Sequence, residues 1–219
     1  MQLISMLAVA AALFLSGCEN YVVSEKPWFT VEDAVGAQAV RPGWWIADWS
    51  DCRVDPNAPS MAWPDCANAM LVPADWTGVF WATDGTEQIL AKGDPMIAQY
   101  EFLTSNDAAV PSQHGYLYFG FDALKRDAEG RALVLRYWPA LCGPPRPDRP
   151  AAATRRPWRG LRLKREGGCI ADDVRALRRA AERSRALETE TPTGRWLRDW
   201  RPGDQSEADW LAAQGIRTH

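Results

Sequence analysis

The sequence predicts an α+β domain in which an antiparallel β-meander, or partly open barrel, packs against a C-terminal helix and is held by two disulfides. Three observations support this fold class. Between residues 78 and 138, short apolar segments are separated by turn signals, as in antiparallel sheets. Between residues 170 and 187, apolar side chains recur at helical spacing. Four cysteines follow Cys18, an even number that favours disulfides.

The first elements after the N-terminal region are short. Residues 18–27 are expected to act as a tether, and a single domain is expected over residues 28–219. The domain opens with Thr30-x-x-Asp33, a capping-box pattern that predicts a brief helical turn. A strand is then predicted at residues 44–47.

A loop and a hairpin follow. Residues 51–64 are rich in Pro, Asp and Asn, which predicts an irregular loop. Apolar segments at 78–83 and 87–91 flank Asp84-Gly85. An Asp-Gly pair between apolar segments is the strongest short-range signal for a β-hairpin.

Three further strands complete the predicted meander, at residues 96–103, 115–124 and 132–138. The strand at 115–124 has two different faces, because successive side chains of a strand point to opposite sides. One face is apolar and is expected to be core, with Leu117, Phe119, Phe121 and Ala123. The other is polar-aromatic and suits a wet surface or the mouth of a ligand site, with Tyr116, Tyr118, Gly120 and Asp122.

The C-terminal third combines a loop with helices. Residues 143–160 contain too many prolines and too few apolar residues to fold alone, so we expect a flexible Pro/Arg-rich loop. The helix at 170–187 carries Asp172 and Asp173 in its first turn, where the helix dipole favours negative charge. A short final helix is expected after Ser206.

The four cysteines of the domain allow three disulfide pairings. We favour Cys52 with Cys66 and Cys142 with Cys169, because each pair closes a Pro-rich loop. Each closure would stabilise the fold by about 3 kcal/mol in the loop-entropy account. A zinc site is disfavoured, since the chain lacks C-x-x-C spacing and a nearby His. No metal is expected.

The N-terminus carries the features of an export signal. Residues 3–15 form an apolar run interrupted only by Ser5, shorter than the about 20 residues of a membrane-spanning helix. The run ends in Leu-Ser-Gly-Cys at residues 15–18, which resembles the lipobox of bacterial lipoproteins. In that family the signal peptide, here residues 1–17, is removed and acyl chains are attached to the cysteine, here Cys18.

The resemblance implies a protein of the cell envelope that acyl chains hold on a membrane. Glu19 follows the cysteine, where Asp would be the usual inner-membrane retention signal in enteric bacteria. We therefore expect outer-membrane attachment facing the periplasm, with the inner membrane as the alternative. No Lys or Arg precedes Cys18, so a start upstream of Met1 stays open.

The mature part also resembles envelope lipoproteins of alphaproteobacteria that have no known activity. The resemblance lies in Trp-Pro-Asp-Cys at 63–66, Trp-Pro-x-x-Cys at 138–142 and Gly-Gly-Cys at 167–169. It implies no substrate and no cofactor.

Charge is shared unevenly along the chain. Residues 1–142 hold 8 Lys/Arg against 17 Asp/Glu, and residues 143–219 hold 17 against 11. This asymmetry could reflect a basic segment that binds polyanions, or two parts that attract each other within one fold. We favour the second explanation, and no nucleic-acid partner is expected.

Candidate catalytic residues are few. The two histidines are His114 and the terminal His219, and no Gly-x-Ser-x-Gly elbow is present. Carboxylate pairs such as Asp48 with Asp51 are expected by chance among 28 acids. No phosphate-binding glycine motif occurs, so no nucleotide cofactor is expected. We assign no catalytic residue.

Twelve tryptophans are the most unusual feature of the composition. Most are expected to pack in the core, since an indole buries a large area and keeps one N–H for a partner. A possible ligand platform, on which a sugar or peptide would stack, is formed by Trp44, Trp45, Trp49, Trp81, Tyr116 and Tyr118.

These observations lead to three functional hypotheses. The first is a non-enzymatic, membrane-anchored envelope lipoprotein that binds an unidentified envelope protein or glycan. The second is a carrier that holds a small apolar or glycan ligand in the sheet, which a filled sheet interior would argue against. The third is an envelope hydrolase, which would require a cleft that holds His114 or a close carboxylate pair.

Overall fold

The structure of the protein is a computed structural model. It describes residues 20–37, 39–47, 52–67, 69–74, 78–81, 87–103, 114–150, 152–165, 167–187, 193–201 and 204. The predictions for the signal segment 1–17, for Cys18, for the Asp84-Gly85 turn and for the final helix after Ser206 lie outside the described residues.

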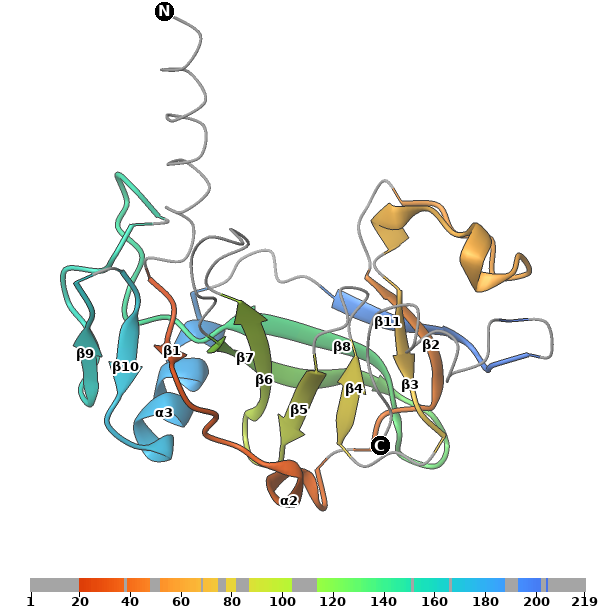
Figure 1. The fold of residues 1–219 in the computed structure, drawn as a ribbon, viewed down its shortest axis with the longest axis horizontal. Coiled ribbons are helices and arrows are strands. Elements are labelled where there is room, and N and C mark those ends of the chain that lie inside the picture. Colours follow the sequence, from red (N-terminus) through yellow and green to blue (C-terminus); the bar gives the residue numbers. More distant parts are fainter. Residues whose placement is uncertain are drawn as a thin grey trace, which may run out of the picture.

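One curled antiparallel sheet forms the centre of the molecule (Figure 1). Its strands follow the order β1-β7-β6-β5-β4-β3-β2-β11-β8, and β8 pairs again with β7. The pairing of β8 with β7 therefore closes the sheet into a barrel. The smallest contact between neighbouring barrel strands in the described residues is the single residue pair Leu71–Trp81 between β3 and β4. The predicted fold class, an α+β protein with a partly open barrel, is confirmed. The barrel strands are β2 (Gly43–Ala47), β3 (Met70–Val72), β4 (Val79–Trp81), β5 (Glu87–Ala91), β6 (Met96–Leu103), β7 (His114–Arg126), β8 (Ala132–Pro139) and β11 (Thr193–Arg198).

Smaller elements cover the outside of the barrel. They are β1 (Val23–Ser24), the one-turn helix α2 (Val31–Ala34), two 3₁₀ turns (Ser60–Ala62 and Asp65–Ala67), the hairpin β9 (Leu161–Leu163) and β10 (Cys169–Ala171), and the helix α3 (Val174–Arg185). The capping box of Thr30 and Asp33 is present at α2. The helix predicted at 170–187 is shorter, because Ile170 lies in β10 and Asp173 is the N-cap whose side chain accepts from Ala176 N.

The interior of the barrel is filled with side chains. Trp45 from β2, Leu90 from β5 and Ala98 from β6 are all buried there. Larger groups close the remaining space, among them Met70, Phe119, Tyr137 and Trp196. Among the residues that the structure describes, the side chains facing the inside of the barrel thus pack into one continuous apolar cluster. This argues against a carrier that holds its ligand inside the sheet.

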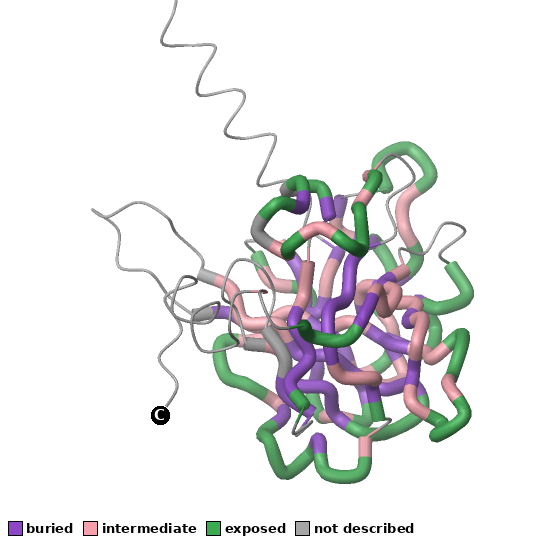
Figure 2. Tube along the Cα trace, turned by 90° about the vertical axis from the view of Figure 1, so that its right-hand side faces the viewer, coloured by how far each residue is buried: buried purple, intermediate pink, exposed green. Residues whose placement is uncertain are grey.

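A second core lies outside β5, β6 and β7, under α3 and the β9–β10 hairpin. Figure 2 shows the resulting buried centre surrounded by exposed turns. Tyr118 is 1% exposed in this layer, and Trp138 bonds to the helix through its Nε1, which donates to Ala181 O at 2.7 Å. The middle of the polar-aromatic face of β7 is therefore covered, because Gly120 leaves room for Trp138, its partner on β8, to bridge sheet and helix. Tyr116 and Asp122, at either side of this covered part, remain partly exposed.

A third core packs the 52–67 loop against β2, β3 and β11. The Cys52–Cys66 disulfide joins the two ends of this loop, with its Cα atoms 5.7 Å apart. Trp63 meets Trp44 edge to face at 5.5 Å between ring centroids. The predicted irregular loop is thus present and pinned. The second predicted pairing, Cys142–Cys169, is also confirmed, with a Cα separation of 5.8 Å.

The start of the described chain is part of the fold. Asn20 is 2% exposed, and its Nδ2 donates to Gly143 O at 3.1 Å. Val22 N then donates to Ala140 O at 2.8 Å, and β1 pairs with β7. The tether expected over residues 18–27 is therefore absent from residue 20 onward, because these residues bond to the barrel and the hairpin.

The Pro/Arg-rich loop at 143–160 is fastened to the core at several points. Thr154 is 3% exposed, and its N–H donates to Asn20 Oδ1 at 3.3 Å. Near the far end of the loop, Trp158 N donates to Cys142 O at 2.9 Å. The loop that we expected to be flexible is thus bonded to the chain start through Thr154 and to the disulfide residue Cys142 through Trp158.

Candidate functional site

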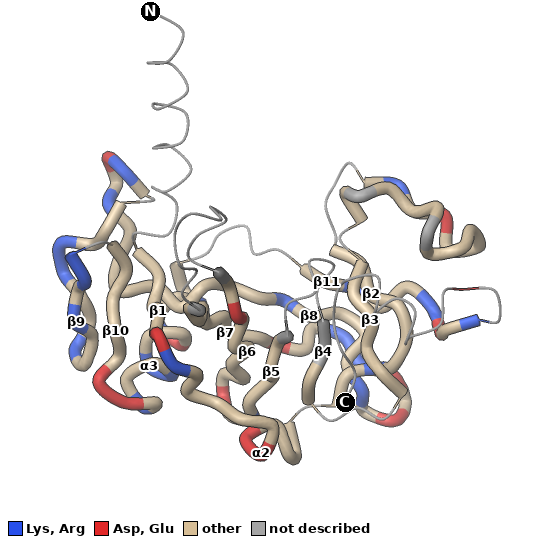
Figure 3. The backbone as a smooth tube through the Cα atoms, viewed as in Figure 1, with Lys and Arg blue, Asp and Glu red and all other residues tan. Residues whose placement is uncertain are grey.

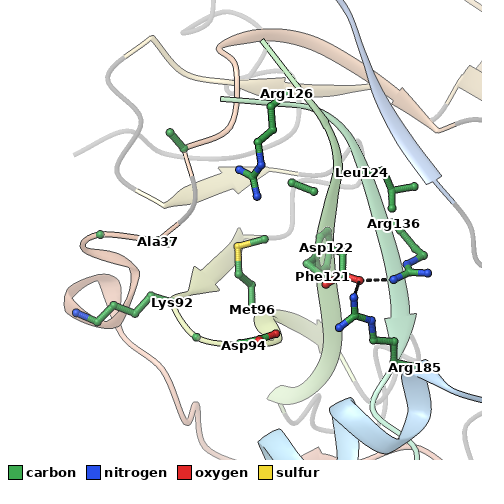
Figure 4. Close-up of a pocket in the computed structure, with 14 residues that line it drawn as sticks. Ala37, Lys92, Asp94, Met96, Phe121, Asp122, Leu124, Arg126, Arg136 and Arg185 are labelled. Carbon is green, nitrogen blue, oxygen red and sulfur yellow. Dashed lines mark hydrogen bonds and ion pairs between the residues drawn. The ribbon is translucent and has the colours of Figure 1, made fainter. Parts of the chain in front are cut away.

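A cleft of about 560 Å³ opens at one mouth of the barrel, between α2 and the ends of β6, β7 and β8 (Figure 4). The apolar part of its lining continues the barrel core, with Met96 8% exposed and Phe121 9% exposed. Leu124, which is 53% exposed, adds an apolar group at the rim. The cleft therefore has an apolar floor that is already held in place by the core.

One wall of the cleft is an ionic cluster. Asp122 of β7 and Arg136 of β8 are cross-strand partners, and their side chains form an ion pair. Arg185 of α3 reaches the same carboxylate, with Nη2 2.6 Å from Asp122 Oδ2. Asp122 is 15% exposed, whereas the two guanidinium side chains are 28% and 42% exposed. One carboxylate thus pairs with two guanidinium groups, so the cluster at the cleft has a net positive charge.

The remaining charged residues of the lining come from the β5–β6 turn and the end of β7. Lys92 and Asp94 lie in the turn, and Arg126 ends β7, where its Nη1 donates to Gly130 O at 3.3 Å. All three residues are exposed. In Figure 4, Lys92 lies on the other side of Met96 from the Asp122 cluster, and Arg126 lies above Met96.

Arg178 of α3 is hydrogen-bonded to the backbone of the β5–β6 turn. Its guanidinium donates to Lys92 O at 2.5 Å and to Pro95 O at 3.1 Å. Burial lowers the pKa of Arg178, although the charge of Asp33 acts against this. A Cβ at Gly93 would lie 1.9 Å from Arg178 Nη1, so glycine allows the turn to approach the helix. Helix α3 therefore positions the β5–β6 turn through Arg178 and contributes Arg185 to the cleft.

The cleft can bind a negatively charged group. Four cations line it, namely Lys92, Arg126, Arg136 and Arg185, against the two carboxylates of Asp94 and Asp122. Guanidinium groups bind carboxylates and phosphates through paired N–H donors. An anion at the walls would leave the remainder of the ligand over Met96 and Phe121.

A smaller cavity of about 310 Å³ lies on the outer face, beside α2. It is lined by Tyr116, Glu32 and Glu101 among others, and Tyr116 Oη lies 3.4 Å from Glu101 Oε1. Gln99, 3% exposed, forms part of the wall. Its Oε1 accepts from Trp28 N and Phe29 N, and its Nε2 donates to Phe29 O. This wall is therefore rigid.

The predicted ligand platform is not assembled in the described part of the chain. Trp44 and Trp45 are 0% and 1% exposed and point to opposite sides of β2, into different cores. Neighbours in a strand cannot share a face, so these two indoles offer no common stacking surface. Trp49 lies outside the described residues, and Trp81 is in β4 with its side chain outside them.

The two predicted tyrosines have separate roles. Tyr118 is buried, its Oη lies 2.5 Å from Ser24 Oγ, and burial raises the pKa of its hydroxyl. It therefore joins β7 to β1. Tyr116 lines the smaller cavity beside α2, whereas the described side chains of Trp44, Trp45 and Tyr118 line neither of the two cavities.

Within the described ranges, no three His, Cys, Asp or Glu side chains are grouped as metal ligands would be. No described helix is long and apolar enough to cross a membrane. His114 begins β7, and its side chain is outside the described part.

Comparison of the chain with family profiles, with curated proteins and with solved structures finds no match. The site therefore rests on its own geometry. Sequence reasoning did not predict the cationic cleft. Its available signal was Asp122, an acid in the middle of an aromatic strand, opposite Arg136.

Proposed function

We propose that the chain is a non-enzymatic, lipid-anchored envelope protein that binds a small anionic amphiphile in its cationic cleft. The observation that carries this proposal is the composition of the cleft, in which four cationic side chains surround the apolar floor of Met96 and Phe121. Binding sites of this kind combine an apolar surface with a few polar groups that fix orientation.

Two features support the envelope location. The lipobox-like segment at residues 15–18 predicts acylation at Cys18, and the described fold begins two residues later, at Asn20. Two disulfides join the four cysteines of the domain. Such bonds persist in oxidising compartments such as the periplasm. We place the protein on the outer membrane facing the periplasm, with the inner membrane as the alternative.

The chemistry of the cleft defines the ligand class. A phosphate or carboxylate would approach the paired guanidinium groups of Arg136 and Arg185, or one of the separate cations Arg126 and Lys92. A short alkyl or aromatic group would then cover the floor, where about 25 cal/mol is gained per Å² of apolar surface removed from water. Neither part alone uses the whole cleft.

The test is a calorimetric titration with octyl phosphate, octanol and inorganic phosphate. We expect octyl phosphate to bind at least about tenfold more tightly than either of the others, since a hydrogen bond to a charged group contributes about 1.5–3 kcal/mol. Arg126→Gln should weaken octyl phosphate binding by about tenfold. The matched control is Lys125→Gln, which removes the same charge from the neighbouring exposed residue outside the cleft lining.

Equal weakening by Arg126→Gln and Lys125→Gln would show general charge attraction and reject the cleft as the site. Binding of octanol as tightly as octyl phosphate would reject an anionic ligand.

The anchor has a separate test. The intact mass of the membrane-extracted protein is measured beside that of a Cys18→Ala variant. We expect the mass of the unmodified sequence to correspond to a chain without residues 1–17 that carries acyl chains, and the mass of the variant to include no acyl chain. Treatment with reductant should add about four protons, because two disulfides are reduced. A full-length, unacylated mass would reject the lipoprotein part of the proposal.

The smaller cavity favours a second candidate, a glycan-binding function. Tyr116 offers an aromatic face beside the carboxylates of Glu32 and Glu101, groups that accept hydrogen bonds from sugar hydroxyls. Titration with chitotriose tests it, and Tyr116→Ala should abolish the heat of binding. Absence of binding to the unmodified protein would remove this candidate.

A further inference from the structure

The most cationic segment of the chain lies beside the point where the described fold begins. Residues 143–165, here called the arginine-rich end, contain eight Lys or Arg and one acid, Asp148. They comprise the 143–160 loop, strand β9 and the two residues that follow it, Lys164 and Arg165. Figure 3 shows these cations gathered along β9 and the adjoining loop, on one end of the molecule.

The chain start is bonded directly to this end. Asn20 donates to Gly143 O, accepts from Thr154 N through its side chain, and accepts from Cys142 N through its carbonyl at 2.7 Å. These three bonds fix where the chain leaves the fold. The exit point is therefore at the base of the arginine-rich end and not at a distance from it.

The predicted site of acylation must lie close to the same end. Asn20 is two positions after Cys18 in the sequence, and an extended chain covers about 3.5 Å per residue, so the separation is at most about 7 Å. Arg155 and Arg156 directly follow Thr154, which bonds to Asn20, and charges attract over a Debye length of about 10 Å at moderate salt. Acyl chains on Cys18 would consequently bring these cations within electrostatic range of the lipid headgroups.

Most charges of the arginine-rich end are available for such a contact. Among the residues that the structure describes, Arg146 pairs with Asp148, Arg162 with Asp172 and Lys164 with Glu25. The other five cations form no ion pair with a described residue and are exposed, namely Arg149, Arg155, Arg156, Arg159 and Arg165.

Strand β9 adds an apolar group to this surface. Leu163 is 43% exposed and lies between Arg162 and Lys164 in the sequence. Arg162 and Leu163 point to opposite sides of β9, and an exposed apolar group at a cationic end of a molecule is a feature of surfaces that contact the headgroup region of a bilayer.

We propose that the arginine-rich end lies flat on anionic phospholipid headgroups and so orients the anchored molecule on its membrane. The proposal rests on the lipid anchor proposed above. It favours a lipid surface over a soluble polyanion because the anchor would hold these cations at the headgroups permanently. The contact would add to the acyl chains the attraction that juxtamembrane basic clusters have for anionic lipids.

The test uses the membrane-extracted protein, reconstituted into vesicles of phosphatidylcholine with or without phosphatidylglycerol. Trypsin cleavage after Arg159 and Arg165 is followed by mass spectrometry, with cleavage after Arg126 at the distant β7–β8 turn as internal reference. We expect cleavage in the arginine-rich end to be at least about tenfold slower on the anionic vesicles, and the difference to disappear at high salt.

A charge variant and a matched control extend the test. Arg155→Gln with Arg156→Gln should remove most of the protection at Arg159. Arg53→Gln with Lys125→Gln removes the same charge from exposed residues elsewhere and should leave the protection intact. Equal cleavage on both vesicles would overturn the proposal, and protection only by added heparin would assign the surface to a soluble polyanion.

Failure of the anchor is distinguishable from failure of this inference. The intact mass reports acylation independently of the cleavage rates. If Cys18 carries no acyl chain, the same full-length protein is sedimented with the two vesicle types. Sedimentation with the anionic vesicles alone would support the lipid contact, and sedimentation with neither would overturn it.

Discussion

At the scale of single residues, Gly120 determines how the barrel meets the helix. It faces Trp138 across the β7–β8 pair, and an added Cβ would lie 2.3–2.5 Å from three atoms of the indole. The indole itself is fully buried, and its Nε1 donates to Ala181 O in α3. A side chain at Gly120 would therefore displace the group that joins sheet and helix.

We predict that Gly120→Ala lowers the free energy of unfolding by about 1–3 kcal/mol, the usual cost of overpacking a filled core. Urea unfolding followed by tryptophan fluorescence measures the change. The control is Gly194→Ala in β11, where the nearest heavy atom to an added Cβ is 3.8 Å away. Similar losses for the two variants would indicate a general intolerance of side chains in the sheet.

Arg198 and Asp204 form the most enclosed ion pair among the described residues. The two guanidinium nitrogens contact both carboxylate oxygens at 2.5 Å, and the side chains are 6% and 3% exposed. Hydrogen bonds from Arg198 are the main reason that the pKa of Asp204 is lowered from 3.8 to about 2. The folded protein thus favours the ionised carboxylate.

This shift predicts a loss of stability in acid. A carboxyl group whose pKa is lower in the folded state stabilises the fold fully above its unfolded pKa, and this contribution is lost as the pH falls from about 4 to about 2. The expected loss is about 2 kcal/mol. Urea unfolding at several pH values should show a flatter profile in this window for Asp204→Asn.

Asp172→Asn, at an exposed ion pair, is the control and should leave the pH profile nearly unchanged. If Asp204→Asn retains the full pH dependence, the loss must be assigned to other carboxyl groups.

At the scale of elements, helix α3 is attached through Ser184. This residue is fully buried, its Oγ accepts from Leu141 N at 2.9 Å and donates to Ala180 O at 2.8 Å. The hydroxyl thereby satisfies the backbone N–H of the segment that follows β8.

We predict that Ser184→Ala costs about 1–3 kcal/mol, because the buried N–H of Leu141 loses its partner. Arg175→Ala, on the exposed side of the same helix, should change stability by less than about 0.5 kcal/mol. Urea midpoints of the two variants decide between a local hydrogen bond and a general effect of helix substitutions. A neutral Ser184→Ala would refute the role assigned to the hydroxyl.

The sequence predicted the elements that follow simple patterns. Strands at 96–103, 115–124 and 132–138 correspond to β6, β7 and β8, and the disulfide pairing was also predicted. Strand β11 was missed, although it connects β2 to β8. Its alternation is obscured because Arg198 is a charged residue in a buried position, where the ion pair with Asp204 compensates for the loss of water.

The candidate site was harder to predict than the fold. The cleft combines Lys92, Asp122 and Arg185, which are far apart in the sequence and meet only because α3 packs beside β7 and β8. The proposed platform failed for a related reason. Trp44 and Trp45 are adjacent in strand β2, and adjacent residues of a strand point their side chains to opposite faces.

At the scale of the whole molecule, the uneven charge of the chain has two structural outcomes. Some cations of the C-terminal part pair with acids of the N-terminal part, as Arg185 does with Asp122 and Lys164 with Glu25. The arginine-rich end retains an excess that such pairs do not balance. Mutual attraction within the fold therefore accounts for only part of the asymmetry.

The Cys142–Cys169 disulfide holds that end to the chain start. It spans 27 residues that include the arginine-rich end, and both sulfurs lie in buried residues. Cys142 N donates to Asn20 O, and Cys169 N donates to Tyr21 O at 3.0 Å. We predict that replacing both cysteines by serine costs about 3.5 kcal/mol by loop entropy and also loosens residues 20–22.

Urea unfolding and hydrogen exchange at the Val22 amide, which bonds to Ala140 O, measure the two effects. The comparison is the Cys52→Ser, Cys66→Ser variant, whose loop of 14 residues predicts a loss of about 3 kcal/mol. Only the first variant should accelerate exchange at Val22, because the 52–67 loop packs on β2, β3 and β11, away from the chain start. Unchanged exchange at Val22 in the first variant would mean that hydrogen bonds alone hold the arginine-rich end beside residue 20.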